Sequence, residues 1–397
     1  IDSNEISVEK CLISRDENQK IFKDEEFKFE IISYSKEGNQ LKKGGNVNNF
    51  KIQIEGELKN GSNKNNDSKI MDLNNGKYEV KLKLKDKGKY SIFVLYDGIN
   101  INSSPFQIQT LSTKIKFYNE LNRPKLTFGS NGNKNGQFSY PYRITTDSEG
   151  NILVCDFHNN RIQIFTSEGN FLLTQGSKGN GNDQFNGPFG ITINSQEDII
   201  VCEYNNNRIQ IFDSEGKFLS MFGSKGNGNG QLDGPRGICV NLNDDILVCD
   251  YNNHRVQIFD SEGNFISTFG SRGNGNGQFD GPIGITTNSK GDIIVCDYNN
   301  RRIQIFNSEG KFISTFGSQG KRFGQFDRPW GICVDLDDNI LVCDSGNHRI
   351  QIFDSEGEYL TQFEVSQPID ITIDPKTQNV IVSRNDHQIS IFFSESQ

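Results

Sequence analysis

Asp245-Ile246-Leu247-Val248-Cys249-Asp250 decides the fold, because closely similar stretches return along the chain at a constant spacing. The phrase Val-Cys-Asp, or Val-Cys-Glu, recurs with a step of 47 residues. It occupies 154–156, 201–203, 248–250, 295–297 and 342–344. Prolines follow in phase, at Pro141, Pro188, Pro235, Pro282 and Pro329. A period of this length marks an array of similar structural units, and it has to be interpreted before local propensities.

One unit contains four short apolar runs separated by polar turns. In the third copy these runs are 237–240, 245–249, 256–259 and 265–269. Each run has the length of a strand, and none has the 3.6-residue period of an amphipathic helix. Four-strand units with a period of about 40–50 residues are typical of propeller blades, which pack face to face around a central axis. The sequence therefore predicts an all-β propeller.

The number of blades follows from an incomplete sixth unit. Residues 368–393 supply only three strand-like runs before the chain ends. The missing run lies upstream of the first unit, where Leu126-Thr127-Phe128-Gly129 is similar to the outer-strand ending Ser267-Thr268-Phe269-Gly270. An N-terminal strand that completes the last blade closes the ring and leaves no open sheet edge at the junction. We therefore expect six blades, closed by a strand at 126–128.

The composition limits the classes of function. Lys+Arg 42 against Asp+Glu 51 gives a formal net charge of -9, so the chain as a whole is not a polycation that coats nucleic acid. No stretch approaches the ~20 continuous apolar residues of a membrane span. The chain opens on polar and charged residues, without the apolar core of a signal peptide. We expect no membrane partner.

Eight cysteines bear on the cellular compartment. Equivalent positions one repeat apart do not approach within the ~7 Å between Cα atoms that a disulfide needs. No Cys/His spacing is that of a zinc site. We expect all eight to be reduced packing residues of a cytoplasmic protein. Five lie in the repeat, Cys155, Cys202, Cys249, Cys296 and Cys343, and the others are Cys11, Cys239 and Cys333.

Two sets of motifs resemble known repeats. Gly-Gln-Phe, then Pro-x-Gly-Ile, and later Val-Cys-Asp and Asn-His-Arg-Ile-Gln-Ile-Phe resemble the NHL repeat over about 121–397. Upstream, 75–80, 88–94 and 104–106 resemble the second half of a filamin-type immunoglobulin repeat, and the alternation in Phe27-Lys28-Phe29-Glu30-Ile31 is consistent with sandwich strands. The expected organisation is a filamin-type immunoglobulin-like domain over 1–112, a linker over 113–124 and a six-bladed NHL propeller over 125–397.

A filamin repeat followed by an NHL propeller resembles the C-terminal half of the tripartite-motif NHL (TRIM-NHL) proteins. In that family an upstream RING, B-box and coiled coil supply ubiquitin-ligase activity and self-association. No RING framework of cysteines and histidines occurs in these 397 residues, so the resemblance implies a recognition half without catalytic residues or cofactor. Whether such domains precede Ile1, and which oligomer forms, the sequence leaves open.

A metal-dependent propeller enzyme is the less favoured alternative. Its metal would need His, Asp or Glu at the inner ends of several innermost strands. The histidines lie instead in the turn between second and third strands, where His254 and His348 occupy the slot filled elsewhere by Asn160, Asn207 and Arg301. A slot that accepts Asn, His and Arg is not a ligand position. We therefore expect no metal and no small-molecule substrate.

An acidic residue and an arginine five positions apart recur in every full blade. Across one hairpin turn the two side chains can form a charge-assisted hydrogen bond that fixes the turn. Because the pair repeats in all five full blades, a structural role is favoured over ligand binding. The pairs are Asp156/Arg161, Glu203/Arg208, Asp250/Arg255, Asp297/Arg302 and Asp344/Arg349.

Charge is distributed unevenly between the two faces of the predicted propeller. The blade connections and the turns between second and third strands open on one face, which carries sixteen basic and twelve acidic residues, a net of +4. From residue 121 onward the chain has 22 basic and 33 acidic residues, so the rest of the propeller carries -15. The propeller is therefore expected to be polarised, with one basic face.

Candidate binding residues are those that vary while the scaffold repeats. The slot after each proline varies most, and exposed rings beside arginine suit either unpaired RNA bases or a protein hot spot. The periodic rings Phe157, Tyr204, Tyr251 and Tyr298 are instead expected to pack between blades. RNA and protein partners stay open. The predicted binding face comprises Tyr142, Arg143, Phe189, Arg236, Ile283 and Trp330, with Arg272, Arg301, Lys321 and Arg322.

Overall fold

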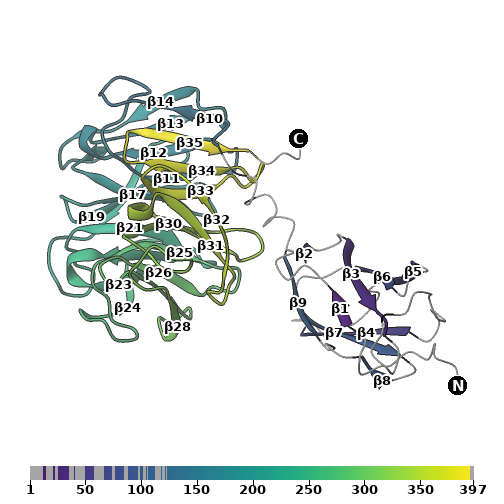
Figure 1. Ribbon diagram of the computed structural model, residues 1–397. Helices are drawn as coiled ribbons and strands as arrows, with labels where there is room; N and C mark the ends of the chain where they lie inside the picture. The colour runs from purple at the N-terminus through teal and green to yellow at the C-terminus, as the bar shows by residue number, and fades with distance from the viewer. Residues whose placement is uncertain are drawn as a thin grey trace, which may run out of the picture. The chain divides into compact units, whose positions relative to one another are not determined.

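The computed structural model describes residues 12–14, 21–22, 26–34, 40, 50–57, 67–73, 77–84, 88–96, 99–101, 104, 106–111, 118, 121 and 123–393. The chain divides into two compact units, Ile1–Phe117 and Tyr118–Gln397 (Figure 1). The described regular structure in both is strand, apart from single turns of helix. The all-β prediction is therefore confirmed.

The first unit is a sandwich of two sheets, as an immunoglobulin-like fold requires. One sheet has the order β1 (Leu12–Ser14), β3 (Glu26–Ile32), β6 (Lys77–Lys83) and β5 (Asp67–Asp72). The other has the order β2 (Ile21–Phe22), β9 (Phe106–Leu111), β7 (Gly88–Tyr96) and β4 (Phe50–Glu57), with β8 (Ile99–Asn100) beside β7.

The sandwich core follows from alternation along its strands. Phe27, Phe29 and Ile31 of β3 are buried, because successive side chains of a strand point to opposite faces of its sheet. They belong to one apolar cluster with Ile92 and Val94 of β7 in the other sheet. The alternation noted in the sequence is thus the inward face of β3.

The second unit is a propeller of four-stranded antiparallel sheets. The five full blades are numbered along the chain. Their strands, from the axis outward, are β11 (Pro141–Thr146), β12 (Ile152–Asp156), β13 (Arg161–Phe165) and β14 (Phe171–Gln175); β17 (Pro188–Ile193), β18 (Ile199–Glu203), β19 (Arg208–Phe212) and β20 (Phe218–Phe222); β21 (Pro235–Val240), β22 (Ile246–Asp250), β23 (Arg255–Phe259) and β24 (Phe265–Phe269); β25 (Pro282–Thr287), β26 (Ile293–Asp297), β27 (Arg302–Phe306) and β28 (Phe312–Phe316); and β29 (Pro329–Val334), β30 (Ile340–Asp344), β31 (Arg349–Phe353) and β32 (Tyr359–Glu364).

Short elements decorate the turns and connections of these blades. One-turn 3-10 helices η3 (Phe157–Asn159), η4 (Tyr251–Asn253) and η5 (Ser345–Asn347) follow the second strands of blades 1, 3 and 5. The connection between blades 1 and 2 contains a parallel pair, β15 (Ser177–Lys178) with β16 (Gln184–Phe185).

Blade 6 closes the ring in the predicted way. Its sheet has the order β10 (Leu126–Phe128), β35 (Gln388–Phe392), β34 (Val380–Arg384) and β33 (Pro368–Ile373). Strand β10 is antiparallel to β35, with Leu126 opposite Ile391 and Phe128 opposite Ile389. Figure 1 shows β10, from the start of this unit, beside the yellow C-terminal strand β35. The innermost strand β33 also contacts β11. The prediction of six blades closed by an N-terminal strand is confirmed.

Burial explains why these sequences form blades. Every residue of the second strand β22 is buried, since a strand covered on both faces carries a continuous apolar run. The outer strand β24 alternates, with Ile266 half exposed. Neighbouring blades meet through rings such as Phe269 and Phe306, whose centroids are 4.7 Å apart. Repetition of this packing generates the ring.

The segment predicted as a linker over 113–124 is partly built into the propeller. Tyr118 and Leu121 are buried, and the compact unit begins at Tyr118, seven residues before the predicted start of the propeller. The Tyr118 hydroxyl donates a hydrogen bond of 3.0 Å to Asp335 Oδ2, and burial beside that carboxylate raises the pKa of Tyr118. The described part of the segment is therefore anchored to blade 5.

Candidate target-binding face of the propeller

The blade connections and the turns between second and third strands lie on the same side of the blades, and we call this side the connection face. Turns between first and second strands and between third and fourth strands form the opposite face. Its loops are 129–140, 157–160, 176–187, 204–207, 223–234, 251–254, 270–281, 298–301, 317–328, 345–348, 365–367 and 385–387. We count with it the strand-end residues that adjoin these loops, among them Tyr142, Arg236, Trp330, Glu364 and Arg384.

Buried ion pairs hold the connections in place. In blade 3, Arg255 Nε donates to Asp250 Oδ2 at 2.8 Å, and Asp250 has no exposed surface. Asp250 also accepts the backbone N–H of Asp233, while Arg255 Nη2 donates to the carbonyl groups of Gly228 and Gln231. Burial raises the pKa of Asp250, although these donors partly offset the effect. The pair therefore links a turn to a connection and is hidden from a partner.

The same pair is present in the other full blades. Each acidic residue has no exposed surface, and the arginine side chains are between 7% and 12% exposed. These pairs are Asp156–Arg161, Glu203–Arg208, Asp297–Arg302 and Asp344–Arg349. Five of the twelve acidic residues assigned to the connection face are thus buried and neutralised.

Arg143, predicted on the binding face, is buried at the axis. Its slot holds glycine in blades 2 to 5, because the innermost strands approach closely: a Cβ at Gly190 would lie 2.3 Å from the Arg236 carbonyl oxygen. Blade 6 has Asp370 in this slot. Arg143 Nη1 pairs with Asp370 Oδ1 at 2.5 Å, and Arg143 Nη2 donates to the Ile283 carbonyl group at 2.5 Å.

This axial ion pair joins the first blade to the last, and it reaches blade 4 across the axis. Arg143 and Asp370 are 6% and 4% exposed, so neither can contact an external partner directly. The axial ion pair could have been predicted from the sequence. Opposite charges replace glycine in the same slot of the two blades that meet when the ring closes, Arg143 in blade 1 and Asp370 in blade 6.

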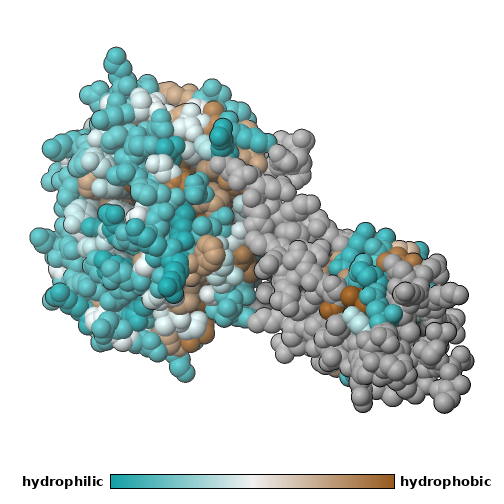
Figure 2. All heavy atoms as spheres, viewed as in Figure 1, coloured by the Kyte–Doolittle hydropathy of each residue, from teal (hydrophilic) through white to brown (hydrophobic). Residues whose placement is uncertain are grey.

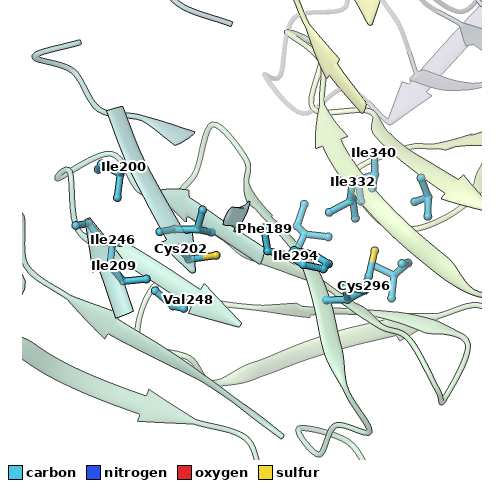
Figure 3. Packing of buried hydrophobic residues seen from close by; sticks show 14 of the residues in the cluster. Phe189, Ile200, Cys202, Ile209, Ile246, Val248, Ile294, Cys296, Ile332 and Ile340 are labelled. Atoms are coloured by element: carbon cyan, nitrogen blue, oxygen red, sulfur yellow. The ribbon is translucent and has the colours of Figure 1, made fainter. Parts of the chain in front are cut away.

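Phe189 and Ile283, also predicted on the face, are buried at 3% and 0% exposure. Figure 3 shows Phe189 inside the apolar cluster, with Cys202 and Cys296 of two different blades nearby. The slot after the proline lies next to the axis, where six strands converge. Apolar side chains there turn into the core, so we leave both residues out of the contact surface.

The repeat cysteines lie around the same core. Cys155, Cys202, Cys249, Cys296 and Cys343 have no exposed surface. Burial raises the pKa of Cys202 to about 12, and its thiol donates to the Arg236 carbonyl group at 2.9 Å. The seven cysteines in the described part of the chain form no disulfide, whereas Cys11 lies outside the described residues.

Aromatic rings gather where the connection face meets the axis. Tyr142 of blade 1 stacks on Trp330 of blade 5 with ring centroids 5.7 Å apart, and it contacts Phe189 at 4.7 Å. Tyr298 meets Trp330 edge-on at 5.5 Å. Tyr142, Trp330 and Tyr298 are half-buried, so this cluster presents part of its ring surface to solvent.

Arg236 is the cation of this aromatic cluster. Its guanidinium carbon lies 3.5 Å from the ring centroid of Tyr251, and 5.3 Å from those of Phe189 and Tyr204. A cation over aromatic faces is held by electrostatic attraction to the rings. Among the described residues no carboxylate pairs with Arg236. Its charge is positioned and remains available to an anion.

Removal of the internal pairs concentrates positive charge on the remaining surface. Six basic and six acidic residues of the original count form the five scaffold pairs and the axial pair. The remaining acidic residues are Asp183, Asp233, Asp280, Asp327, Glu364 and Asp386. The remaining basic residues, ten in number, are Lys134, Lys178, Lys225, Arg236, Arg272, Arg301, Lys321, Arg322, Arg328 and Arg384. The net charge of the connection face is still +4, but only sixteen charged residues now contribute to it instead of twenty-eight.

The predicted outer cations differ in accessibility. Arg272, Lys321 and Arg322 are exposed, whereas Arg301 is half-buried. In the described part of the chain, no group of three or more His, Cys, Asp or Glu side chains could hold a metal ion. No helix among the described residues is long and apolar enough to cross a membrane.

Comparison with known families matches both halves of this architecture. The filamin/ABP280 repeat model matches residues 5–107. The NHL repeat model matches five segments, 138–165, 185–212, 232–259, 279–306 and 326–353. The chain is a filamin-repeat and NHL-repeat protein. The five matched NHL repeats are the five full blades, and blade 6 lacks the Val-Cys-Asp phrase that defines them.

Relatives of this filamin–NHL chain include ubiquitin ligases. It is 34% identical over 144 residues to the E3 ubiquitin-protein ligase TRIM71 of Gallus gallus, a match that covers 36% of this chain and 15% of that protein. It is 36% identical over 88 residues to protein lin-41 of Caenorhabditis elegans, covering 22% and 8% respectively. The filamin–NHL chain resembles the C-terminal half of the TRIM-NHL proteins, as its motifs predict.

Similar solved structures support the fold alone. A Bacteroides thetaiotaomicron protein of unknown function covers 95% of the filamin–NHL chain with a TM-score of 0.52 and 12% identity. The Xanthomonas campestris gluconolactonase XC5397 covers 66% of it with a TM-score of 0.51 and 15% identity.

Proposed function

We propose that the filamin–NHL chain is the target-binding part of a TRIM-NHL-type ubiquitin ligase, and that its connection face binds single-stranded or hairpin RNA. The observation that carries this proposal is the separation of charges. Acidic residues of the repeat are buried in ion pairs, whereas most of the ten remaining cations are exposed and Arg236 lies over aromatic rings. Phosphates are attracted by the cations, and unpaired bases stack on the rings.

Arg236 is the proposed central contact. It departs from the apolar and aromatic residues at the equivalent slots Tyr142, Phe189, Ile283 and Trp330. Its packing on Tyr251 orients the guanidinium group in advance, which lowers the conformational entropy lost on binding. We therefore expect Arg236 to contact a phosphate or a base edge close to the axis.

A protein target is the second candidate. The stacked Tyr142 and Trp330 beside Arg236 have the composition of a protein hot spot. Figure 2 shows a propeller surface that is mostly hydrophilic in that view, with hydrophobic residues in separate spots. Protein interfaces are about as polar as the rest of a surface, so the hydropathy does not separate the two candidates. The excess of positive charge on the connection face favours RNA.

The test is a fluorescence-anisotropy titration of labelled, random-sequence single-stranded RNA at two salt concentrations. The chain should bind with an affinity that falls as salt rises. Arg236→Met keeps the apolar stem over Tyr251 and removes the charge, so it should weaken binding and lower the slope of log K against log salt by about 0.7. Glu215→Lys, on the opposite face, should change affinity little. Absence of salt-dependent binding by the unaltered chain, together with loss of a protein target by Arg236→Met, would establish a protein-docking face instead.

A further inference from the structure

Departures from the repeat gather at one junction between blades. We call the contact between consecutive blades a seam. At the seam of blades 4 and 5, basic or aromatic residues fill slots that hold Asn, Gly or His at the seams of blades 1 and 2, 2 and 3, and 3 and 4. These residues are Arg301, Lys321, Arg322, Phe323 and Arg328, and we call them the seam strip.

The other seams set the comparison. The seam of blades 6 and 1 has Lys134 in the slot of Arg322 and Tyr140 in the slot of Arg328. One cation is lost at the seam of blades 4 and 5, where Gln319 replaces the basic residue found at Lys178, Lys225 and Arg272. The gains outnumber this loss, and they indicate a site because the repeat itself already satisfies the fold.

Phe323 forms a stacking platform at the outer end of the seam strip. Its slot holds Asn135, Asn182, Asn229 and Asn276 in the other full blades. Phe323 is 68% exposed, and it stacks on Tyr359 with ring centroids 5.0 Å apart and planes at 13°. One face of the ring is thus covered by Tyr359 and the ring is otherwise open, an arrangement that suits a flat, unpaired base.

The loop that carries this platform is held on both sides. Arg349 Nη2 and the backbone N–H of Gln325 donate to the carbonyl group of Arg322, at 2.8 and 3.1 Å. The backbone N–H of Gly324 donates to Gln351 Oε1 at 2.9 Å. Phe323 lies between two tethered residues, so little backbone order would be lost on binding.

Arg301 replaces a hydrogen bond that joins the other blades. Its slot has a positive φ in all six blades, and Asn or His there accepts a backbone N–H from the next blade. The acceptors are Asn160 Oδ1, Asn207 Oδ1, His254 Nδ1, His348 Nδ1 and His387 Nδ1. The arginine side chain has no hydrogen-bond acceptor. The seam of blades 4 and 5 therefore lacks this hydrogen bond and has the positive charge of Arg301 in its place.

Arg328 strengthens the charge at the same seam. The residue that donates this N–H from the next blade is glycine in blades 2, 3 and 4. The equivalent residue in blade 5 is Arg328, whose side chain is 56% exposed. In the described residues its only acidic partner is Asp327, at 3.7 Å, itself 38% exposed. A surface pair of this kind contributes little stability, so Arg328 is free to exchange Asp327 for another anion.

We infer that the seam strip is the site where the RNA of the proposed function unstacks a nucleotide: one base lies on Phe323, and Arg301, Lys321, Arg322 and Arg328 contact the flanking phosphates. The inference rests on the proposed function, and it assigns that function a specific part of the connection face. Four cations against one carboxylate suit a phosphodiester chain, and the open ring beside them suits its bases.

The test restores at each slot a residue used by the other blades. Phe323→Asn alters no charge, so it should lower affinity for single-stranded RNA by about 5- to 150-fold without altering the salt slope. Arg301→His with Arg328→Gly restores the hydrogen-bond acceptor, so it should keep or raise the melting temperature while lowering the salt slope by about 1.4. Lys290→Ala, on the opposite face, is the matched charge control and should leave both quantities unchanged.

The outcomes separate the two proposals. A Phe323→Trp chain that retains affinity where Phe323→Asn loses it, together with quenching of 2-aminopurine placed in the RNA, supports the stacking site. Unchanged affinity in Phe323→Asn while Arg236→Met weakens binding overturns the seam strip and leaves the proposed function standing. If the unaltered chain binds no RNA at either salt concentration, the proposed function fails and the seam strip fails with it.

Discussion

Asp147 accepts a hydrogen bond from Asn151, whereas Asn194 donates the same hydrogen bond to Asp198 one blade later. The two residue types exchange places, but each turn between first and second strands keeps one amide and one carboxylate. Blades 3 and 4 follow the second arrangement and blade 5 follows the first. At the residue scale, the propeller therefore repeats interactions more strictly than it repeats residues.

Thiol reactivity tests the packing of the repeat cysteines. With a pKa of about 12, Cys202 is roughly one part in 10⁴ thiolate at pH 8, and its sulfur is inaccessible. Ellman's reagent should therefore leave the five repeat thiols of the folded chain unmodified for hours at pH 8. After denaturation without reductant, eight thiols should react, because the full sequence contains eight cysteines. A titre of six or fewer would reveal a disulfide and contradict the prediction.

The axial ion pair gives a second prediction at this scale. Asp370→Gly leaves the Arg143 guanidinium buried without its carboxylate, which should cost about 3–5 kcal/mol in free energy of unfolding. Arg143→Gly with Asp370→Gly recreates the glycine slot of blades 2 to 5, so the double variant should regain part of that loss. Urea denaturation measures both changes. A double variant no more stable than Asp370→Gly would show that the ion pair is not the cause.

At the element scale, the strands of the propeller could be predicted almost entirely, whereas the exposure of their side chains could not. The blade count and the closing strand follow from a strict period and from the similarity of 126–128 to the outer strands. The burial of Phe189 and Ile283 depends on how six inner strands converge, which no single repeat encodes. The packing of Tyr118 was missed for a similar reason, since its partner Asp335 lies 217 residues away.

Truncation tests the closing strand. A chain that begins at Gly136 lacks β10 and with it Phe128, whose ring lies 4.9 Å from Phe165. It should aggregate, or melt about 10 °C or more below a chain that begins at Tyr118, because an open sheet edge and apolar surface become exposed. A start at Arg123 keeps β10 but loses Tyr118, so it should melt between the two. Equal melting temperatures for all three chains would contradict closure by β10.

At the scale of the whole propeller, charge separates the two faces. The repeat buries acidic residues beneath the connection face, and the remainder of the propeller carries the excess negative charge, so an anionic target is attracted to one face and repelled elsewhere. The sequence predicted this polarity from loop positions. It did not predict which of the ten cations outside the buried pairs cluster, because the seam strip becomes visible only when missing hydrogen bonds and ring stacking are compared between blades.

Hydrogen–deuterium exchange of the chain with and without single-stranded RNA tests the central claim most directly. Binding on the connection face predicts slower exchange in its connections and turns, above all at 298–301 and 317–328, and no change in the turns of the opposite face such as 213–217 and 288–292. Protection confined to the opposite face, or an exchange pattern identical with and without RNA at a concentration that saturates binding, would contradict the assignment of the connection face as the site of target recognition.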